Sequence, residues 1–108
     1  MILDYGKVGV KPRFLQALSV PGIGHYEAIR EEIIRLLREE RERRQVSKYV
    51  VSQRSGVSES MLSLVERGFR NPTMELMLRI ADAIGADLPA LIQKATATVR
   101  KRQGRAGK

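Results

Sequence analysis

Apolar residues recur at helical spacing from about residue 26 onward, and this pattern predicts an all-α fold. Ile29, Ile33 and Leu37 stand four positions apart, which places them on one face of an amphipathic helix. Glu and Arg side chains fill the opposite face. We therefore expect a first long helix over residues 26–44.

Cap and turn residues divide the following part of the chain into four shorter helices, which makes five in all. A Ser, Thr or Asp side chain can accept a hydrogen bond from the free amides at a helix start, and Gly can take the left-handed conformation that ends a helix. Pro89 is tolerated because it lies in a first turn. The predicted starts are Ser47, Ser58, Thr73 and Asp87, and the first three of these helices end at Gly56, Gly68 and Gly85.

The two ends of the chain are less regular. Apolar positions in residues 2–10 allow a short extended piece, and the stretch PRFLQALS allows a helical turn before VPGIG, whose Pro and Gly are typical helix breakers. The last residues combine Gly with basic side chains, which fits either a flexible arm or an extension of the fifth helix. We expect an N-terminal extension over residues 1–24, a helical domain over residues 25–97 and a basic tail over residues 98–108.

Composition argues against several kinds of chemistry. The 108 residues include one His and no Cys, so a disulfide framework, a thiolate metal site or a His-based catalytic group has too few parts. His25 has no identifiable Ser or Asp partner, and Glu39, Glu40 and Glu42 lie where solvated Glu–Arg pairs are expected. The sequence therefore predicts no metal, no cofactor and no enzyme activity.

Hydrophobic content is typical of a soluble globular domain. At 43% it is too high for a disordered chain, yet no apolar run approaches the roughly 20 residues that cross a bilayer. The N-terminal residues also lack the apolar region of a secretory signal. We expect a cytoplasmic protein without a membrane partner.

Charge is distributed unevenly along the chain, whose formal net charge is +8. Residues 91–108 contain six basic residues and no acid, and residues 41–70 contain seven basic residues and three acids. Lys and Arg that neutralise phosphates release counterions, so concentrated positive charge favours binding to a nucleic acid. An ordinary solvated helix surface is the alternative for residues 41–70.

Several features of residues 41–73 occur at fixed spacing. SGVS forms the turn, Leu62 and Val65 stand three apart as inward residues, ERG ends that helix, and NPT and RIADAIG follow. This pattern resembles the phage Cro/repressor (XRE-like) helix-turn-helix family, and the resemblance continues to Ile92. It implies an all-α, five-helix lambda-repressor-like DNA-binding domain whose helix 58–66 enters the major groove.

The resemblance also assigns roles to individual residues. In this family the second helix of the motif contacts bases, while the first helix and adjoining loops contact phosphates. The implied base contacts are Glu59, Ser60, Ser63 and Leu64, and the implied phosphate contacts are Lys48, Ser58, Arg70 and Asn71. Arg41 and Glu66 match positions that form a structural ion pair in related repressors.

Three residues depart from the family pattern. Glu59 is a carboxylate, which can accept a hydrogen bond only from a base amino group such as that of cytosine. Leu64 is apolar, so it could meet a thymine methyl group or join Met61 in an interface with another protein. Val50 replaces the Glu that would complete a capping box with Ser47.

Together these features predict a sequence-specific transcriptional regulator, a repressor that binds double-stranded DNA as a homodimer. Two-fold pairing that sets the recognition helices about 34 Å apart is how such folds gain affinity. Leu76, Ile80 and Ala83 form an apolar stripe that could pair two copies or pack against the N-terminal extension. The basic tail is expected to add sequence-independent attraction to phosphates, and no small-molecule ligand is implied.

Two other hypotheses remain open. The domain could be a protein-interaction module, such as an antitoxin-like or degenerate helix-turn-helix partner. The stretch LSVPGIGHYEA at residues 18–28 also weakly resembles a helix-hairpin-helix element, in which the amides of a glycine-rich turn bind phosphates. The salt dependence of DNA binding separates a DNA-binding protein from an interaction module.

Overall fold

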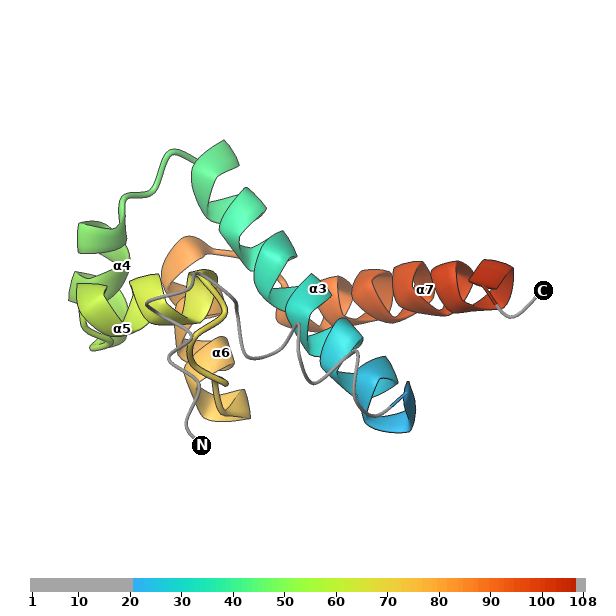
Figure 1. The fold of residues 1–108 in the computed structure, drawn as a ribbon. Coiled ribbons are helices and arrows are strands. Elements are labelled where there is room, and N and C mark those ends of the chain that lie inside the picture. The colour runs from blue at the N-terminus through green and yellow to red at the C-terminus, as the bar shows by residue number, and fades with distance from the viewer. Residues whose placement is uncertain (1–20, 107–108) are drawn as a thin grey trace, which may run out of the picture.

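The computed structural model describes residues 21–106, with side chains described from residue 24 to residue 103. This part of the chain folds into five α-helices and no strand (Figure 1), which confirms the predicted all-α, five-helix fold. The helices are α3 (Pro21–Arg43), α4 (Lys48–Ser55), α5 (Glu59–Glu66), α6 (Met74–Ile84) and α7 (Leu88–Ala106). The extended piece and the helical turn predicted for the first 20 residues lie outside the described residues.

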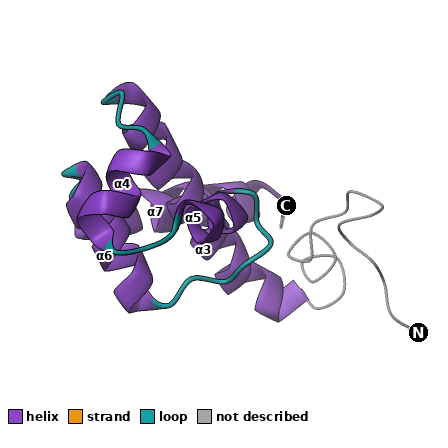
Figure 2. Cartoon of the chain, turned by 90° about the vertical axis from the view of Figure 1, so that its left-hand side faces the viewer, coloured by secondary structure: helices purple, strands orange, loops and turns teal. Residues whose placement is uncertain are grey.

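The helices form two groups. α4 and α5 pack together at one end of the molecule, while α3 crosses α7 and shares with it the most extensive contact between helices (Figures 1 and 2). α6 contacts α4 on one side and α3 and α7 on the other. It is therefore the helix on which the two groups meet.

Two apolar clusters make up the core, and α6 contributes to both. One cluster joins α3, α6 and α7, and the other joins α4, α5 and α6. Because α6 is buried on two sides, it needs apolar residues on both, and it has the largest share of apolar residues among the short helices. The buried members are Ile33, Leu36, Leu37, Met77, Ala81, Leu88 and Ala95 in the first cluster, and Val51, Leu62, Ile80, Ala83 and Ile84 in the second.

The predicted pairing stripe on α6 is wrong. Ile80 is 2% exposed and Ala83 is 4% exposed, and both belong to the cluster shared with α4 and α5, against which Leu76 also packs. Met74 and Leu78 on the same helix are about half exposed. The pairing prediction failed because α4 and α5 cover this face of α6, and the periodicity of α6 does not show which helices pack against it.

α3 begins earlier than predicted. VPGIG was expected to interrupt the helix, but residues 21–24 belong to α3. Pro21 occupies the first position, where its missing N–H removes no hydrogen bond from the helix. The turn that a helix-hairpin-helix element needs does not form in these residues.

α7 extends to Ala106 and includes most of the predicted basic tail. Val99 is 1% exposed, and Arg102 Nη2 lies 3.4 Å from Glu32 Oε1. The alternative of an extended fifth helix therefore describes this segment, and a flexible arm does not. The boundary predicted between residues 97 and 98 falls inside α7.

A buried ion pair joins α3 to the end of α5. Arg41 Nε donates to Glu66 Oε2 at 2.8 Å, and Arg41 Nη2 donates to Glu66 Oε1 at 3.1 Å. A third donor, Arg41 Nη1, bonds the Val46 carbonyl at 3.0 Å. Arg41 and Glu66 are 8% and 9% exposed, so the two charges depend on each other rather than on water.

We expect Glu66→Ala to lower the free energy of unfolding by about 3–5 kcal/mol, because it leaves the Arg41 guanidinium buried without its carboxylate. Chemical denaturation measures this loss. Glu75→Ala is the matched control, since Glu75 pairs with Arg79 at 2.9 Å but its side chain is 73% exposed. Its expected cost is below about 1 kcal/mol, and equal losses for the two variants would contradict the structural role of the pair.

A second buried carboxylate ties α3 to α7. Glu32 is 5% exposed and accepts hydrogen bonds from Arg35 Nε at 3.1 Å and from Arg102 Nη2 at 3.4 Å. The hydrogen bond from Arg35 is the main cause that lowers the pKa of Glu32, and Arg102 adds to it while burial opposes it. The ionised carboxylate is therefore the form that the folded chain favours.

Stability from Glu32 is present above the ordinary pKa of 4.5 and is lost as the pH falls through the lower pKa of the folded state. We expect Glu32→Gln to cost about 1–2 kcal/mol at neutral pH. The difference from the parent chain should shrink below pH 4.5, as followed by denaturant unfolding at several pH values. A difference that stays constant down to pH 3 would show that Glu32 does not carry this acid dependence.

Candidate nucleic-acid interface

A three-residue turn orients α5 against α4. Gly56 ends α4 with φ 78°, and its N–H donates to the Ser52 carbonyl at 3.0 Å. Ser58 begins α5 by accepting a hydrogen bond from the Met61 N–H at 3.0 Å. The positive φ favours Gly at this position, because L side chains rarely adopt it.

The cap at the start of α4 forms without a complete capping box. Ser47 Oγ accepts from the Val50 N–H at 3.1 Å. Val50 cannot return a side-chain hydrogen bond to the Ser47 N–H, as the sequence indicated. One of the two hydrogen bonds of the box is therefore present.

α5 separates a buried side from an outer side. Leu62 and Val65 are 1% and 2% exposed, and they anchor the helix in the core. The predicted base contacts lie on the other side: Glu59 and Ser60 are exposed, and Ser63 and Leu64 are partly exposed. The short helix thus presents a mostly polar surface that is held from behind by apolar packing.

One pair of predicted contacts lies close together. Lys48 Nζ donates to Ser63 Oγ at 3.1 Å and so links the first residue of α4 to the outer side of α5. Sequence reasoning assigned Lys48 to a phosphate and Ser63 to a base, with no contact between them. The spacing of 15 residues carries no helical signal, so the pairing depends on the angle between the two helices.

The remaining predicted phosphate contacts lie at opposite ends of α5. Ser58 is exposed at the start of the helix, and Arg70 and Asn71 are exposed in the loop that leads to α6. A helix N-terminus presents free amides and a positive dipole end, which suits a phosphate. These three residues frame the outer side of α5 and do not contact one another through any described hydrogen bond.

Arg67 is a candidate that sequence reasoning missed. It caps the end of α5, is exposed, and has its guanidinium carbon 5.2 Å from the centre of the Phe69 ring. Its spacing from Ser60 and Ser63 is seven and four residues, which is the spacing of one helix face. That spacing was the signal available in the sequence.

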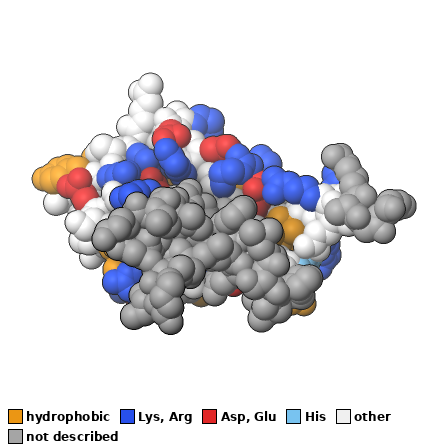
Figure 3. Space-filling model, viewed as in Figure 1, with side chains coloured by type: hydrophobic (Ala, Val, Ile, Leu, Met, Phe, Trp, Pro, Cys, Tyr) orange, Lys and Arg blue, Asp and Glu red, His pale blue; other side chains and the backbone are white. Residues whose placement is uncertain are grey.

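Arg35, Arg38 and Arg43 of α3 differ from these cations because carboxylates on the same helix neutralise them. Figure 3 shows Lys and Arg alternating with Asp and Glu over the upper part of the view, rather than one uniform basic patch. Hydrogen bonds from Arg43 are the main cause that lowers the pKa of Glu40. The pairs within α3 are Glu32–Arg35, Arg35–Glu39, Arg38–Glu42, Glu40–Arg43 and Glu40–Arg44.

By contrast, no described carboxylate forms an ion pair with Lys48, Arg67 or Arg70. Positive charge that is available to a ligand is therefore found around α5, and Arg54 on α4 and Lys94, Arg100 and Lys101 on α7 likewise form no described ion pair. The C-terminal end of α7 lies at the opposite end of the molecule from α4 and α5 (Figure 1). The basic tail therefore lies away from α5, and its sequence-independent attraction to phosphates stays a prediction.

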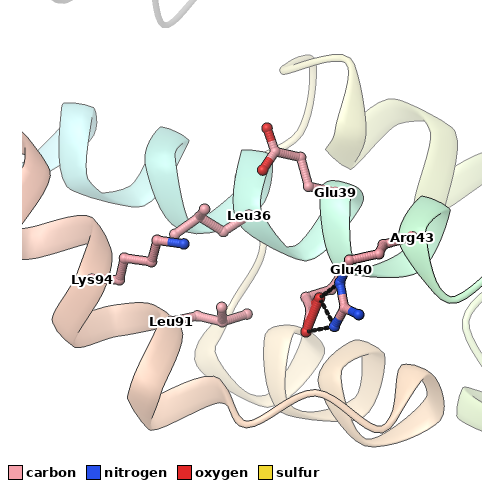
Figure 4. A pocket seen from close by; sticks show the side chains of 6 residues that line it. All are labelled: Leu36, Glu39, Glu40, Arg43, Leu91 and Lys94. Atoms are coloured by element: carbon pink, nitrogen blue, oxygen red, sulfur yellow. Dashed lines mark hydrogen bonds and ion pairs between the residues drawn. The ribbon is translucent and has the colours of Figure 1, made fainter.

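A hollow of about 370 Å³ lies between α3 and α7 (Figure 4). Leu36 and Leu91 line it together with Lys94 and the Glu40–Arg43 ion pair. Both carboxylates beside it, Glu39 and Glu40, already bind arginines, as the sequence predicted. The hollow therefore brings together no unpaired acid and base.

The described part of the chain shows no sign of a metal site or of a membrane span. It contains no group of three or more His, Cys, Asp or Glu side chains that could hold a metal ion. None of its helices is both long enough and apolar enough to cross a membrane. The outer side of α5 is thus the strongest candidate site among the described residues.

Comparison with protein families identifies the domain type. Residues 32–94 match the model of a family described as a helix-turn-helix domain, and this match covers more than half of the chain. The matched region includes α4, α5 and α6 in full, about half of α3 and the beginning of α7.

Two curated proteins are similar to part of the chain. Both are uncharacterized HTH-type transcriptional regulators of Mycobacterium tuberculosis, one from strain CDC 1551 / Oshkosh and one from strain H37Rv. Each is 39% identical over 59 residues, which are 55% of this chain and 42% of the relative. The chain thus matches about two fifths of the length of these relatives, and no solved structure gives a significant match.

The turn can be tested without touching any candidate contact. A Cβ at residue 56 would meet only Arg79 Nη1, at 3.8 Å, so Gly56→Ala adds no clash and its cost comes from the positive φ. We expect a loss of about 1–2 kcal/mol in the free energy of unfolding, measured by thermal or chemical denaturation. Gly56→Asn is the control, because Asn tolerates this conformation, and it should cost clearly less; an unchanged stability for Gly56→Ala would contradict the strained turn.

Proposed function

The chain belongs to the helix-turn-helix domain family, and from this premise we propose that it is a sequence-specific, DNA-binding transcriptional regulator of the phage Cro/repressor (XRE-like) type. The observation that supports this best is the outer side of α5, which is polar, exposed and surrounded by cations that no described carboxylate pairs. The two relatives, both named as HTH-type transcriptional regulators, support it as well.

In the proposed complex α5 enters the major groove of double-stranded DNA. This groove is about 12 Å wide and admits an α-helix. Glu59, Ser60, Ser63 and Leu64 then contact the edges of bases. The buried side of α5, through Leu62 and Val65, keeps the helix fixed in the domain while the outer side faces the DNA.

Phosphate contacts set the register of α5 in the groove. Ser58 at the start of the helix and Arg70 and Asn71 after its end are proposed to bind phosphates that flank the bases read by the helix. Such contacts position a protein on the duplex but carry no sequence information themselves. We add Arg67 to the residues with this role.

We further propose that the protein acts as a homodimer and represses transcription by occupying its operator. An eight-residue recognition helix reads only a few base pairs, so two copies about 34 Å apart are needed for affinity and selectivity. Ile80 and Ala83 cannot form the dimer surface, because both are buried within the chain. The function proposed is binding in the cytoplasm, without catalysis, cofactor or small-molecule ligand.

The alternative is an interaction module that binds protein through Met61 and Leu64. Both side chains are only partly exposed, whereas Glu59 and Ser60 at the start of α5 are exposed. This arrangement favours DNA as the partner of α5.

The dependence of binding on salt distinguishes the two functions. For six phosphate contacts we expect the logarithm of the DNA association constant to fall against the logarithm of salt concentration with a slope of about −5. Arg70→Ala should reduce the slope by about one for each bound copy. Fluorescence anisotropy with a labelled duplex measures both.

Lys101→Ala is the control for this experiment, because Lys101 is exposed near the far end of α7 and should leave the slope unchanged. A slope near zero for the parent chain would favour the interaction module. If the slope changes in Lys101→Ala but not in Arg70→Ala, the phosphate contacts lie on α7 and not around α5, which contradicts the proposal.

A further inference from the structure

Lys48 and Ser63 form a single hydrogen-bonding unit at the edge of the outer side of α5. We propose that this unit selects guanine, through the N7 and O6 atoms of its major-groove edge, and that the operator therefore contains a G·C pair opposite the start of α4. Lys48 then contacts a base instead of the phosphate that the family resemblance implied. This inference rests on the proposed function, and it adds the identity of a base to it.

The hydrogen bond between the two side chains limits what each can offer to a base. A Lys ammonium group has three N–H donors and no acceptor. One N–H of Lys48 is used by Ser63 Oγ at 3.1 Å, which leaves two donors. Ser63 uses a lone pair to accept that bond, so its own O–H remains as a donor, and a base donor that approached Ser63 would meet the neighbouring positive charge.

A unit that presents donors requires acceptors on the base. In the major groove guanine presents two adjacent acceptors, N7 and O6, whereas adenine presents one acceptor beside an amino donor. Thymine presents the single acceptor O4 beside a methyl group, and cytosine presents an amino donor. Guanine is therefore the base that matches two or more donors placed side by side.

The position of Lys48 also indicates a role in binding. It is the first residue of α4, and this helix has no acidic residue in its first turn. A cation at a helix N-terminus is disfavoured by the helix dipole, and no described carboxylate pairs with Lys48. Lys48 therefore does not stabilise α4 at this position. The acceptor atoms of a base edge in the major groove would interact favourably with its ammonium group.

Glu59 is consistent with the same kind of base pair. It lies one helical turn before Ser63, on the same side of α5. Its ionised carboxylate only accepts, so it matches the amino group of cytosine. The acceptors of guanine and the amino donor of its paired cytosine lie next to one another on the groove edge, so Glu59 is placed to bind the same base pair or the adjacent one.

The experiment is selection of bound duplexes from a random pool, followed by affinity measurements on the selected site. The full chain is compared with Lys48→Met, Ser63→Ala and the double variant, and Lys101→Met serves as the matched control for removal of a lysine. A duplex in which 7-deazaguanine replaces the selected guanine removes N7 alone. Thermal denaturation of each variant checks that the fold is retained, as expected for two partly exposed side chains.

For the parent chain we expect one guanine in every selected half-site, and a loss of affinity on the order of tenfold when adenine or 7-deazaguanine replaces it. Lys48→Met and Ser63→Ala should each remove most of this discrimination at that position. The double variant should lose little more than either single variant, because the two side chains act as one unit. Lys101→Met should select the same site as the parent chain.

Two failures are distinguishable. If no sequence is enriched over the random pool, the proposed function itself fails. If a sequence is enriched but lacks a common guanine, or if Lys48→Met keeps the parent preference at every position, the function stands and the guanine assignment is overturned.

Discussion

The Arg41–Glu66 ion pair is the interaction on which the geometry of the candidate site depends most. It joins the end of the long helix α3 to the last residue of α5, and both side chains are buried. A helix of eight residues is not stable in isolation, because nucleating a helix is costly and few hydrogen bonds follow. The orientation of α5 therefore comes from its contacts: this ion pair at its end, the Ser58 cap at its start, and Leu62 and Val65 behind it.

Because these contacts hold α5 in place, the side chains on its outer side contribute little to the stability of the fold. Glu59 and Ser60 are exposed and Ser63 and Leu64 are partly exposed, while Arg35, Arg38 and Arg43 of α3 are engaged by carboxylates on the same helix. The chain thus uses acidic residues to neutralise much of α3 and leaves Lys48, Arg67 and Arg70 near α5 without such partners, as it does Lys94, Arg100 and Lys101 on α7. A domain that binds an anionic polymer through one surface requires this separation, because cations spread evenly would not favour any one orientation on DNA.

The helices could be predicted from the sequence, because periodicity and caps depend on residues that lie close together along the chain. The sequence also indicated Arg41 with Glu66, but only through the family resemblance. The early start of α3 has a local cause, which is Pro21 at the first helical position, whereas the other differences come from contact between distant segments. Ile80 and Ala83 looked free because nothing local shows that α4 and α5 cover them. The Lys48–Ser63 bond likewise depends on the angle between two helices, and the helical tail depends on burial of Val99 against the rest of the domain.

The most direct test of the account is an NMR titration of the ¹⁵N-labelled full chain with a duplex recovered by selection. The account predicts that the amide signals of residues 58–64, Lys48 and the loop at Arg70 and Asn71 change most, while those at the C-terminal end of α7 stay in place. Changes concentrated on α7 or on the exposed face of α6, with the signals of α5 unchanged, would contradict the claim that α5 is the surface that reads DNA.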